Sequence, residues 1–255
     1  MKLLLQRIAI LVGFLAFWQF AAGRLIREFY VSSPTKIATV FWSWVMDGSL
    51  FYHAGITATE AFAGFGLGAA AGLGIGLLLG RAEKLADMLN PFIIAFYSIP
   101  KVALAPLFII WFGIGLDMKI VLTAVIVFFL VFLNTYTGVR GVSRELVTIL
   151  QLMGANEGHV LRKVIVPSAI VWVFAGLRLS VPYAIIGAIV GEIIASNRGL
   201  GYLLSSSSSQ FNTAGTFAAL VAIILLSAIL NISVNYLATL AMPWQGVEKQ
   251  REVAV

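Results

Sequence analysis

The chain has no cysteine and few charged residues. The absence of cysteine excludes disulfides and thiolate metal sites, and the two histidines, His53 and His159, are too far apart in sequence to indicate a metal cluster. Only 11% of the 255 residues are charged and 60% are hydrophobic, whereas a soluble domain carries about 25% charged residues. The chain therefore lacks the polar surface to cover itself in water, and a lipid bilayer is the solvent that suits it.

The sequence also lacks a Gly-x-x-x-x-Gly-Lys-[Ser/Thr] loop, the motif that holds nucleotide phosphates. We therefore do not expect this chain to hydrolyse ATP or to carry a cofactor. The formal net charge is +6, but the basic residues are scattered, as the positive-inside rule of membrane proteins produces. Nucleic acid is accordingly not an expected partner.

Six apolar stretches are long enough to cross a bilayer, which takes about 20 residues each. They are predicted at Leu3–Gly23, Ile56–Gly80, Pro91–Gly115, Lys119–Gly138, Ser168–Ala195 and Ala214–Met242. A signal peptide is the alternative for the first stretch, but its length and the poor cleavage site at residues 17–20 favour an uncleaved span. We predict an all-α polytopic membrane protein with about six transmembrane helices.

The segments between these spans suggest a domain division. Pro34–Met46 repeats apolar residues at helical spacing and carries two tryptophans, which predicts an amphipathic helix in the membrane interface. Arg81–Asn90 is predicted to be a polar link. The predicted division is an N-terminal span plus interfacial helix at 1–50, a core of five spans at 51–245 with a loop at 139–167, and a tail at 246–255.

Glycines recur at every fourth residue of the second predicted span. This spacing places them in one ridge along the helix, where another helix backbone can approach closely. The prediction concerns helix packing and says nothing about a substrate. The residues of the ridge are Gly64, Gly68, Gly72, Gly76 and Gly80.

The third predicted span contains Pro91, Pro100 and Pro106. Each proline removes a helical hydrogen bond and can bend the helix. In lipid the freed carbonyls need partners from protein or from a water-lined cavity. We therefore expect this span to be broken and to face the protein interior.

Basic residues predict the orientation of the chain. If the N-terminus is inside, the cytoplasmic segments contain more Lys and Arg than the outer segments do. Lys119 is counted among the outer segments. Both termini and the 139–167 loop are thus predicted to be cytoplasmic. In that loop Leu146, Ile149, Leu150 and Met153 form one apolar helical face. Docking of a soluble partner and an ordinary connecting loop are both consistent with this pattern.

Just after this face, a short second helix is predicted. Gly154 ends the first helix, and Asn156 is expected to cap the second, which is predicted to end near Lys163 before Pro167 opens the fifth span.

Sequence motifs in the loop resemble those of a known family. The letters QLMGA at 151–155 and RKVIVP at 162–167 are similar to the EAA loop of binding-protein-dependent ABC importer permeases, with Gly154 and Pro167 in the expected frame. The EAA tripeptide itself does not match at 148–150, and Gly158 replaces a bulky residue. Three further segments resemble the sulfonate, taurine and nitrate branch, namely SIPKVALAPL at 98–107, WFGIG at 111–115, and GEII at 191–194 with GLGY at 199–202.

The resemblance implies a type I ABC importer permease fold, paired as a homodimer in the bacterial inner membrane. It implies that two ATP-binding subunits dock on the cytoplasmic loops and bind the ATP, and that a periplasmic solute-binding protein delivers a small, anionic solute such as a sulfonate, taurine or nitrate. The loop residues to which this docking role is assigned are Leu150, Met153, Gly154, Ala155, Glu157, His159, Arg162 and Pro167.

Several ionisable residues fall within the predicted spans, where a charge facing lipid costs at least about 2.5–3.5 kcal/mol. Glu60 is near the start of its span and is expected to reach the interface. For Lys101, Arg178 and Glu192, structural ion pairs and lining of a solute pathway are left open. The predicted pathway residues are Tyr97, Ser98, Lys101, Arg178 and Glu192.

Two other classes of function compete with the importer. A membrane-embedded enzyme needs converging acids, bases or nucleophiles, and the acidic residues within the spans are few and far apart. A secondary transporter commonly has inverted repeats, and no internal repeat is evident in these six spans.

Overall fold

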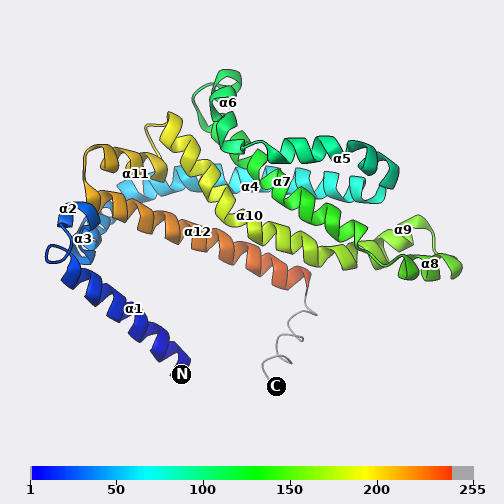
Figure 1. The fold of residues 1–255 in the computed structure, drawn as a ribbon, viewed down its shortest axis with the longest axis horizontal. Coiled ribbons are helices and arrows are strands. Elements are labelled where there is room, and N and C mark those ends of the chain that lie inside the picture. Colours follow the sequence, from blue (N-terminus) through cyan, green and yellow to red (C-terminus); the bar gives the residue numbers. More distant parts are fainter. Residues whose placement is uncertain (1, 243–255) are drawn as a thin grey trace. The chain divides into compact units, whose positions relative to one another are not determined.

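The structure, a computed structural model, describes residues 2–242 and all side chains within them except those of residues 2–4 and 83. The regular elements of this described part are all helical (Figure 1). They are α1 (Lys2–Ala21), α2 (Glu28–Val31), α3 (Pro34–Met46), α4 (Ser49–Arg81), α5 (Glu83–Ser98), the 3-10 helix η1 (Lys101–Leu104), α6 (Ala105–Phe112), α7 (Leu116–Arg140), α8 (Arg144–Leu152), α9 (Glu157–Val160), the π-helical turn η2 (Leu161–Ile165), α10 (Val166–Ala195), α11 (Leu200–Ser209) and α12 (Thr213–Ala241).

Four helices are long and apolar enough to cross a membrane, namely α4, α7, the continuous stretch Glu157–Ala195, and α12. A fifth span forms if the bent pair Lys84–Ser98 and Lys101–Phe112 is counted as one. The predicted first span corresponds to α1, whose described apolar part, Leu5–Ala21, is a shorter helix. The all-α, polytopic membrane fold predicted from the sequence is confirmed.

Two predicted boundaries are wrong. The polar link predicted at Arg81–Asn90 is largely helical, because α5 begins at Glu83 and continues through Pro91. Its polar residues occupy one face of an amphipathic helix, a pattern that resembles a link when read as composition alone. The second helix of the 139–167 loop does not end near Lys163, because it continues through the π-helical turn into α10.

By its internal contacts the described chain forms two compact units. One comprises the described part of Met1–Ala58 together with Glu192–Leu226, and the other comprises Thr59–Gly191 together with the described part of Ser227–Val255. The predicted division at residues 50 and 245 follows the expected roles of the segments and stays a prediction; the 246–255 tail lies outside the described residues.

In the unit containing Thr59–Gly191, α7 lies against glycines of both α4 and α10. A Cβ added to any of the five ridge glycines would come closer than 3.0 Å to an atom of α7, whereas a Cβ on Gly66 or Gly74 would meet nothing within 4 Å. From α10, a Cβ on Gly187 would lie 2.9 Å from the Thr123 Cα. The missing side chains therefore let three helix backbones lie in close contact.

In the unit containing the N-terminal helices, aromatic contacts connect residues that are distant in sequence. Trp18 of α1 lies edge-on to Phe217 of α12, with 5.4 Å between ring centroids. Phe29 stacks on Phe211, and its carbonyl accepts a hydrogen bond of 2.5 Å from the Thr213 hydroxyl. The α3 helix has the bounds predicted for the interfacial helix, and the Thr35 amide donates to the Gln19 side chain at 3.2 Å.

Candidate functional site

The third predicted span is broken at Pro100. The helical segments on either side of the break differ in direction by 80°, with Ile99 and Pro100 in extended conformations between them. Pro106 lies in the first turn of α6, where a proline does not disturb helical hydrogen bonding. The prediction of a broken span is therefore confirmed, and Pro100 is the proline that lies at the break.

A cavity of about 350 Å³ lies beside this break. Tyr97, Ser98 and Lys101, three of the residues predicted to line a pathway, all lie in its wall. The Lys101 ammonium is 4.6 Å from the centres of both the Tyr97 and Phe129 rings, and it donates a hydrogen bond to the Tyr97 carbonyl. Tyr183 of α10 completes the aromatic part of the wall.

The charge in this cavity is a cation held by aromatic faces. Such rings attract a cation through their negative faces without neutralising its charge. Among the described side chains, no carboxylate forms an ion pair with Lys101. The cavity can therefore accommodate a small anion, or a planar group that stacks on the rings.

Arg178 lies elsewhere on the fold. It is exposed near the middle of α10. Exposure at such a depth needs either water or another protein surface, because lipid disfavours the guanidinium.

Glu60 does not lie where the sequence predicted. It is fully buried and forms a 2.5 Å ion pair with Lys119, whose side chain is only 2% exposed. The expectation that Glu60 reaches the interface is wrong, because its side chain is buried against α7. The assignment of Lys119 to an outer segment stays a prediction. The lysine stem lies against Gly191 of α10, where an added Cβ would be 2.8 Å from the Lys119 Cγ. The pair joins α4 to α7 inside the protein, where each charge is compensated by the other.

Glu192 is also buried, and its carboxylate lies at the start of α11. One oxygen accepts a 2.6 Å hydrogen bond from the Thr57 hydroxyl, and the other accepts one of 2.6 Å from the Gly201 amide. The Leu200 amide donates to the Thr57 hydroxyl at 2.8 Å. A carboxylate at a helix N-terminus compensates the exposed backbone amides there. These hydrogen bonds give Glu192 a structural role at the start of α11, whereas the structural alternative left open from the sequence was an ion pair between spans.

The glycine that precedes α11 makes this arrangement possible. Gly199 has φ +104°, a conformation that side chains disfavour, and a Cβ on it would collide with the Glu192 carboxylate. Its amide donates to Nδ1 of His53 at 2.9 Å. The sequence segments GEII and GLGY, far apart from α4 in the chain, thus form one buried connection with the start of α4.

The segment at 139–167 contains the predicted short amphipathic helix. Ser143 caps α8 by accepting the Leu146 amide. At its other end Gly154 has φ +84°, and the amides of Gly154 and Ala155 donate to the carbonyls of Gln151 and Leu150. These two bonds form a Schellman motif, the usual end of a helix that stops at glycine.

The apolar face of α8 is exposed in this chain. Leu152 is 83% exposed and Met153 is 79% exposed, more than any other large apolar side chain of the described residues. Leu150, chosen from the spacing, is only partly exposed. The predicted face ran through Leu150 and Met153 and did not include Leu152, although Leu152 lies three residues after Ile149.

The other residues predicted for docking lie just beyond α8. Asn156 caps α9 as predicted, accepting the His159 amide at 2.9 Å. Glu157 is exposed and lies 3.4 Å from the Arg81 guanidinium. Arg162 is exposed in η2, and Pro167 lies in the first turn of α10.

Comparison with known proteins identifies the family. A family model described as "Binding-protein-dependent transport system inner membrane component" matches residues 68–244. The chain is 35% identical over 235 residues to a riboflavin transport system permease protein of Chloroflexus aurantiacus, covering 91% of this chain and 87% of that protein. It is 32% identical over 229 residues to a formylaminopyrimidine transport permease protein of Halalkalibacterium halodurans, covering 89% and 91%.

A third relative and a solved structure extend the comparison. The chain is 26% identical over 251 residues to a taurine transport system permease protein of Escherichia coli, covering 94% of this chain and 91% of that protein. Its fold is similar to that of a chain in the methionine ABC transporter MetNI in an inward-facing conformation, with a TM-score of 0.64 and 20% identity. That match covers 76% of this chain and 95% of the other.

Proposed function

The chain belongs to the family of inner membrane components of binding-protein-dependent ABC importers, and from that premise we propose that it forms the pathway for a small anionic solute. In the proposed assembly, two copies of the chain pair in a bacterial inner membrane with both termini in the cytoplasm. Each copy docks one ATP-binding subunit, and a periplasmic binding protein delivers the solute. ATP is bound and hydrolysed by the docked subunits.

The exposed end of α8 carries the docking proposal. Leu152 and Met153 expose most of their surface at the end of a helix that also carries Arg144 and Glu145. A helix with charges on one face and an exposed apolar end suits a groove on a soluble partner. The Schellman turn at Gly154 holds this end in place, so movement of the partner can be passed to α10 through the continuous helix that starts at Glu157.

Pairing of two copies is supported by Arg178. A charge at the centre of a helix that faces lipid costs at least about 2.5–3.5 kcal/mol, and Arg178 is exposed near the middle of α10 in the single chain. A second copy that encloses a water-filled pathway would remove this side chain from lipid. Neighbouring apolar side chains on α10, Trp172 and Leu179 among them, are also exposed and available for such a contact.

The substrate class is inferred from the Lys101 cavity. Its ammonium keeps a net positive charge beside a space of about 350 Å³, a size suited to a small solute. A sulfonate group, which taurine carries, is an anion that an ammonium binds. The relative from Escherichia coli is named for taurine transport.

A planar heterocycle is the second candidate substrate. The same cavity has Tyr97, Phe129 and Tyr183 in its wall, and aromatic rings stack on flat solutes. The relatives named for riboflavin and for formylaminopyrimidine carry such molecules.

Copurification tests the docking proposal. The double variant Leu152→Asp with Met153→Asp should release the ATP-binding subunit from the detergent-solubilised complex, because it replaces exposed apolar surface with charge. Gln151→Asp adds a charge to the same helix turn without removing apolar surface and is the matched control. Retention of the ATP-binding subunit by the double variant would overturn the docking assignment.

Uptake into proteoliposomes that contain the whole complex tests the substrate. Lys101→Gln should reduce ATP-driven uptake of taurine, while Lys101→Arg should retain most of it, because the positive charge is preserved. Uptake of riboflavin or formylaminopyrimidine that is insensitive to Lys101→Gln, with no uptake of taurine, would favour the heterocycle. Loss of copurification in Lys101→Gln would instead indicate a structural role.

A further inference from the structure

The aromatic rings of the Lys101 cavity form a position for a cation, and the chain fills this position with its own side chain. The Lys101 ammonium lies 4.6 Å from the centre of the Tyr97 ring and 4.6 Å from the centre of the Phe129 ring. The two ring centres are 6.3 Å apart, and the ring planes are inclined by 52°. A cation within about 6 Å of a ring centre is attracted to the face of that ring, so both rings hold the same ammonium.

The break at Pro100 explains how the lysine reaches these rings. In a continuous helix the Tyr97 carbonyl would accept the backbone amide of Lys101, four residues later. Instead α5 ends at Ser98, the next helical segment differs in direction by 80°, and the Lys101 ammonium donates to the Tyr97 carbonyl. A cation near the C-terminus of a helix stabilises the last carbonyls. This contact at the end of α5 also places the charge against the rings.

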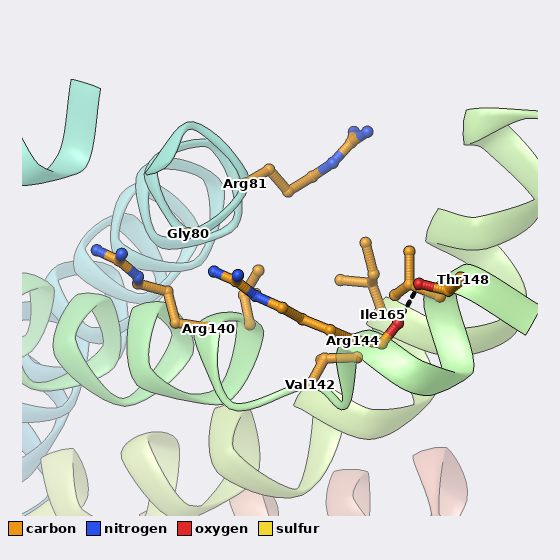
Figure 2. Close-up of a pocket in the computed structure, with 9 residues that line it drawn as sticks. Gly80, Arg81, Arg140, Val142, Arg144, Thr148 and Ile165 are labelled. Carbon is orange, nitrogen blue, oxygen red and sulfur yellow. Dashed lines mark hydrogen bonds between the residues drawn. The ribbon is translucent and has the colours of Figure 1, made fainter. Parts of the chain in front are cut away.

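Arg140 shows the more common way in which this chain holds a cation near an aromatic ring. It lines a second cavity, of about 400 Å³, at the ends of α4 and α7 (Figure 2). Its guanidinium is 5.6 Å from the centre of the Tyr136 ring, but it also forms a 2.7 Å ion pair with Asp87. No carboxylate of the described side chains pairs with Lys101 in this way. The two rings and the Tyr97 carbonyl are therefore the groups that hold the Lys101 ammonium.

We propose that Lys101 determines the charge selectivity of its cavity by occupying a latent site for an organic cation. Paired aromatic faces bind solutes that carry a quaternary ammonium group. With Lys101 in place, such a solute meets a filled position and a charge of its own sign, so the cavity accepts anions and excludes cations. The inference rests on the proposed function, in which this cavity lies on the solute pathway.

Binding of choline to the purified full-length chain in detergent tests the proposal. Lys101→Ala vacates the position and should bind choline about tenfold more tightly than the wild type, since each of the two rings contributes a factor of roughly two to five. Adding Phe129→Leu to Lys101→Ala removes one ring and should weaken choline binding by that factor. Lys101→Arg keeps a cation against the rings and should bind choline no more tightly than the wild type.

A neutral analogue separates attraction of a cation from the filling of an apolar space. The alcohol in which carbon replaces the nitrogen of choline has the same shape without the charge, and it should gain little affinity in Lys101→Ala. An equal gain for both compounds would overturn the proposal, as would equal choline affinity in the wild type and in Lys101→Ala. Circular dichroism verifies that each variant is helical, and Lys101→Ser, which also vacates the position, replaces Lys101→Ala if that variant does not fold.

Taurine uptake by the whole complex separates this inference from the proposed function. If Lys101→Ala gains choline binding and the wild-type complex does not take up taurine, the latent cation site stands and the proposal of an anionic solute fails. If taurine uptake depends on Lys101 but Lys101→Ala gains no choline binding, the proposed function stands and the latent cation site fails.

Discussion

An alanine in place of a ridge glycine adds one methyl group to the α4–α7 contact. A Cβ on Gly72 would lie 2.7 Å from the Phe128 carbonyl oxygen and 2.9 Å from the Phe132 backbone nitrogen. Both atoms belong to the α7 backbone, which cannot rotate away as a side chain does. Ordinary contact begins at 3.4 Å, so the helices must separate by about 0.7 Å, a gap that removes roughly a quarter to a half of the dispersion energy of the facing atoms.

This separation has a definite energetic scale. Overpacking of a close contact costs about 1–3 kcal/mol, while alanine stabilises a helix by about 1 kcal/mol relative to glycine. Gly74→Ala is the matched control, because its Cβ would meet nothing within 4 Å on the same helix. The helix term is common to both variants. Gly72→Ala should therefore be less stable than Gly74→Ala by the packing term alone, about 1–3 kcal/mol.

Denaturant unfolding of the purified chain in detergent, followed by the helical circular dichroism signal, measures this difference. Gly66→Ala, another α4 position whose Cβ would meet nothing within 4 Å, provides a second control. Equal free energies of unfolding for Gly72→Ala and Gly74→Ala would refute the reasoning, because the α7 backbone could not then lie against Gly72.

Three further outcomes are expected. Lys119→Met removes the cation from the buried Glu60 carboxylate and should lower the free energy of unfolding by about 3–5 kcal/mol. The double variant Lys119→Met with Glu60→Leu should recover most of this loss, because no buried charge is left unpaired. An undiminished loss in the double variant would contradict the ion-pair account. Gly199→Ala should destabilise by at least about 1–3 kcal/mol, because its φ of +104° strains any side chain, and an unchanged unfolding midpoint would count against it. Ser98→Cys should react with a water-soluble thiol reagent, at a rate that changes when ATP is trapped in the docked subunits, whereas Ile75→Cys should stay protected in lipid. The chain has no native cysteine to interfere. Protection of Ser98→Cys both with and without trapped ATP would place the pathway elsewhere.

Local patterns determined which segments are helical and where several of them end. Apolar runs of about 20 residues can be satisfied only by helices in lipid, because every backbone group needs a partner within the segment. The same locality explains why the Asn156 cap and the bounds of α3 were predicted correctly. Capping and amphipathic spacing depend on residues within one or two turns of each other, and such residues are visible in the sequence.

Spacing also predicted the face of α4 that packs, but it did not name the helix that lies against it. The five ridge glycines repeat at a fixed interval, so their common face follows from helix geometry alone. Gly187 of α10 also lies against α7, but only Gly191 repeats it at the same four-residue interval, and this short pair was not recognised in the sequence.

Only the tertiary structure decided how the buried charges are compensated. The Lys119–Glu60 pair joins residues 59 positions apart, and the Thr57–Glu192 hydrogen bond joins residues 135 positions apart. A sequence indicates that a charge inside a span needs a partner, because the cost of burying it alone is large. Which residue supplies that partner depends on the rotation and depth of two separate helices, and these are set by how closely the glycines of α4 and α10 allow their backbones to approach α7.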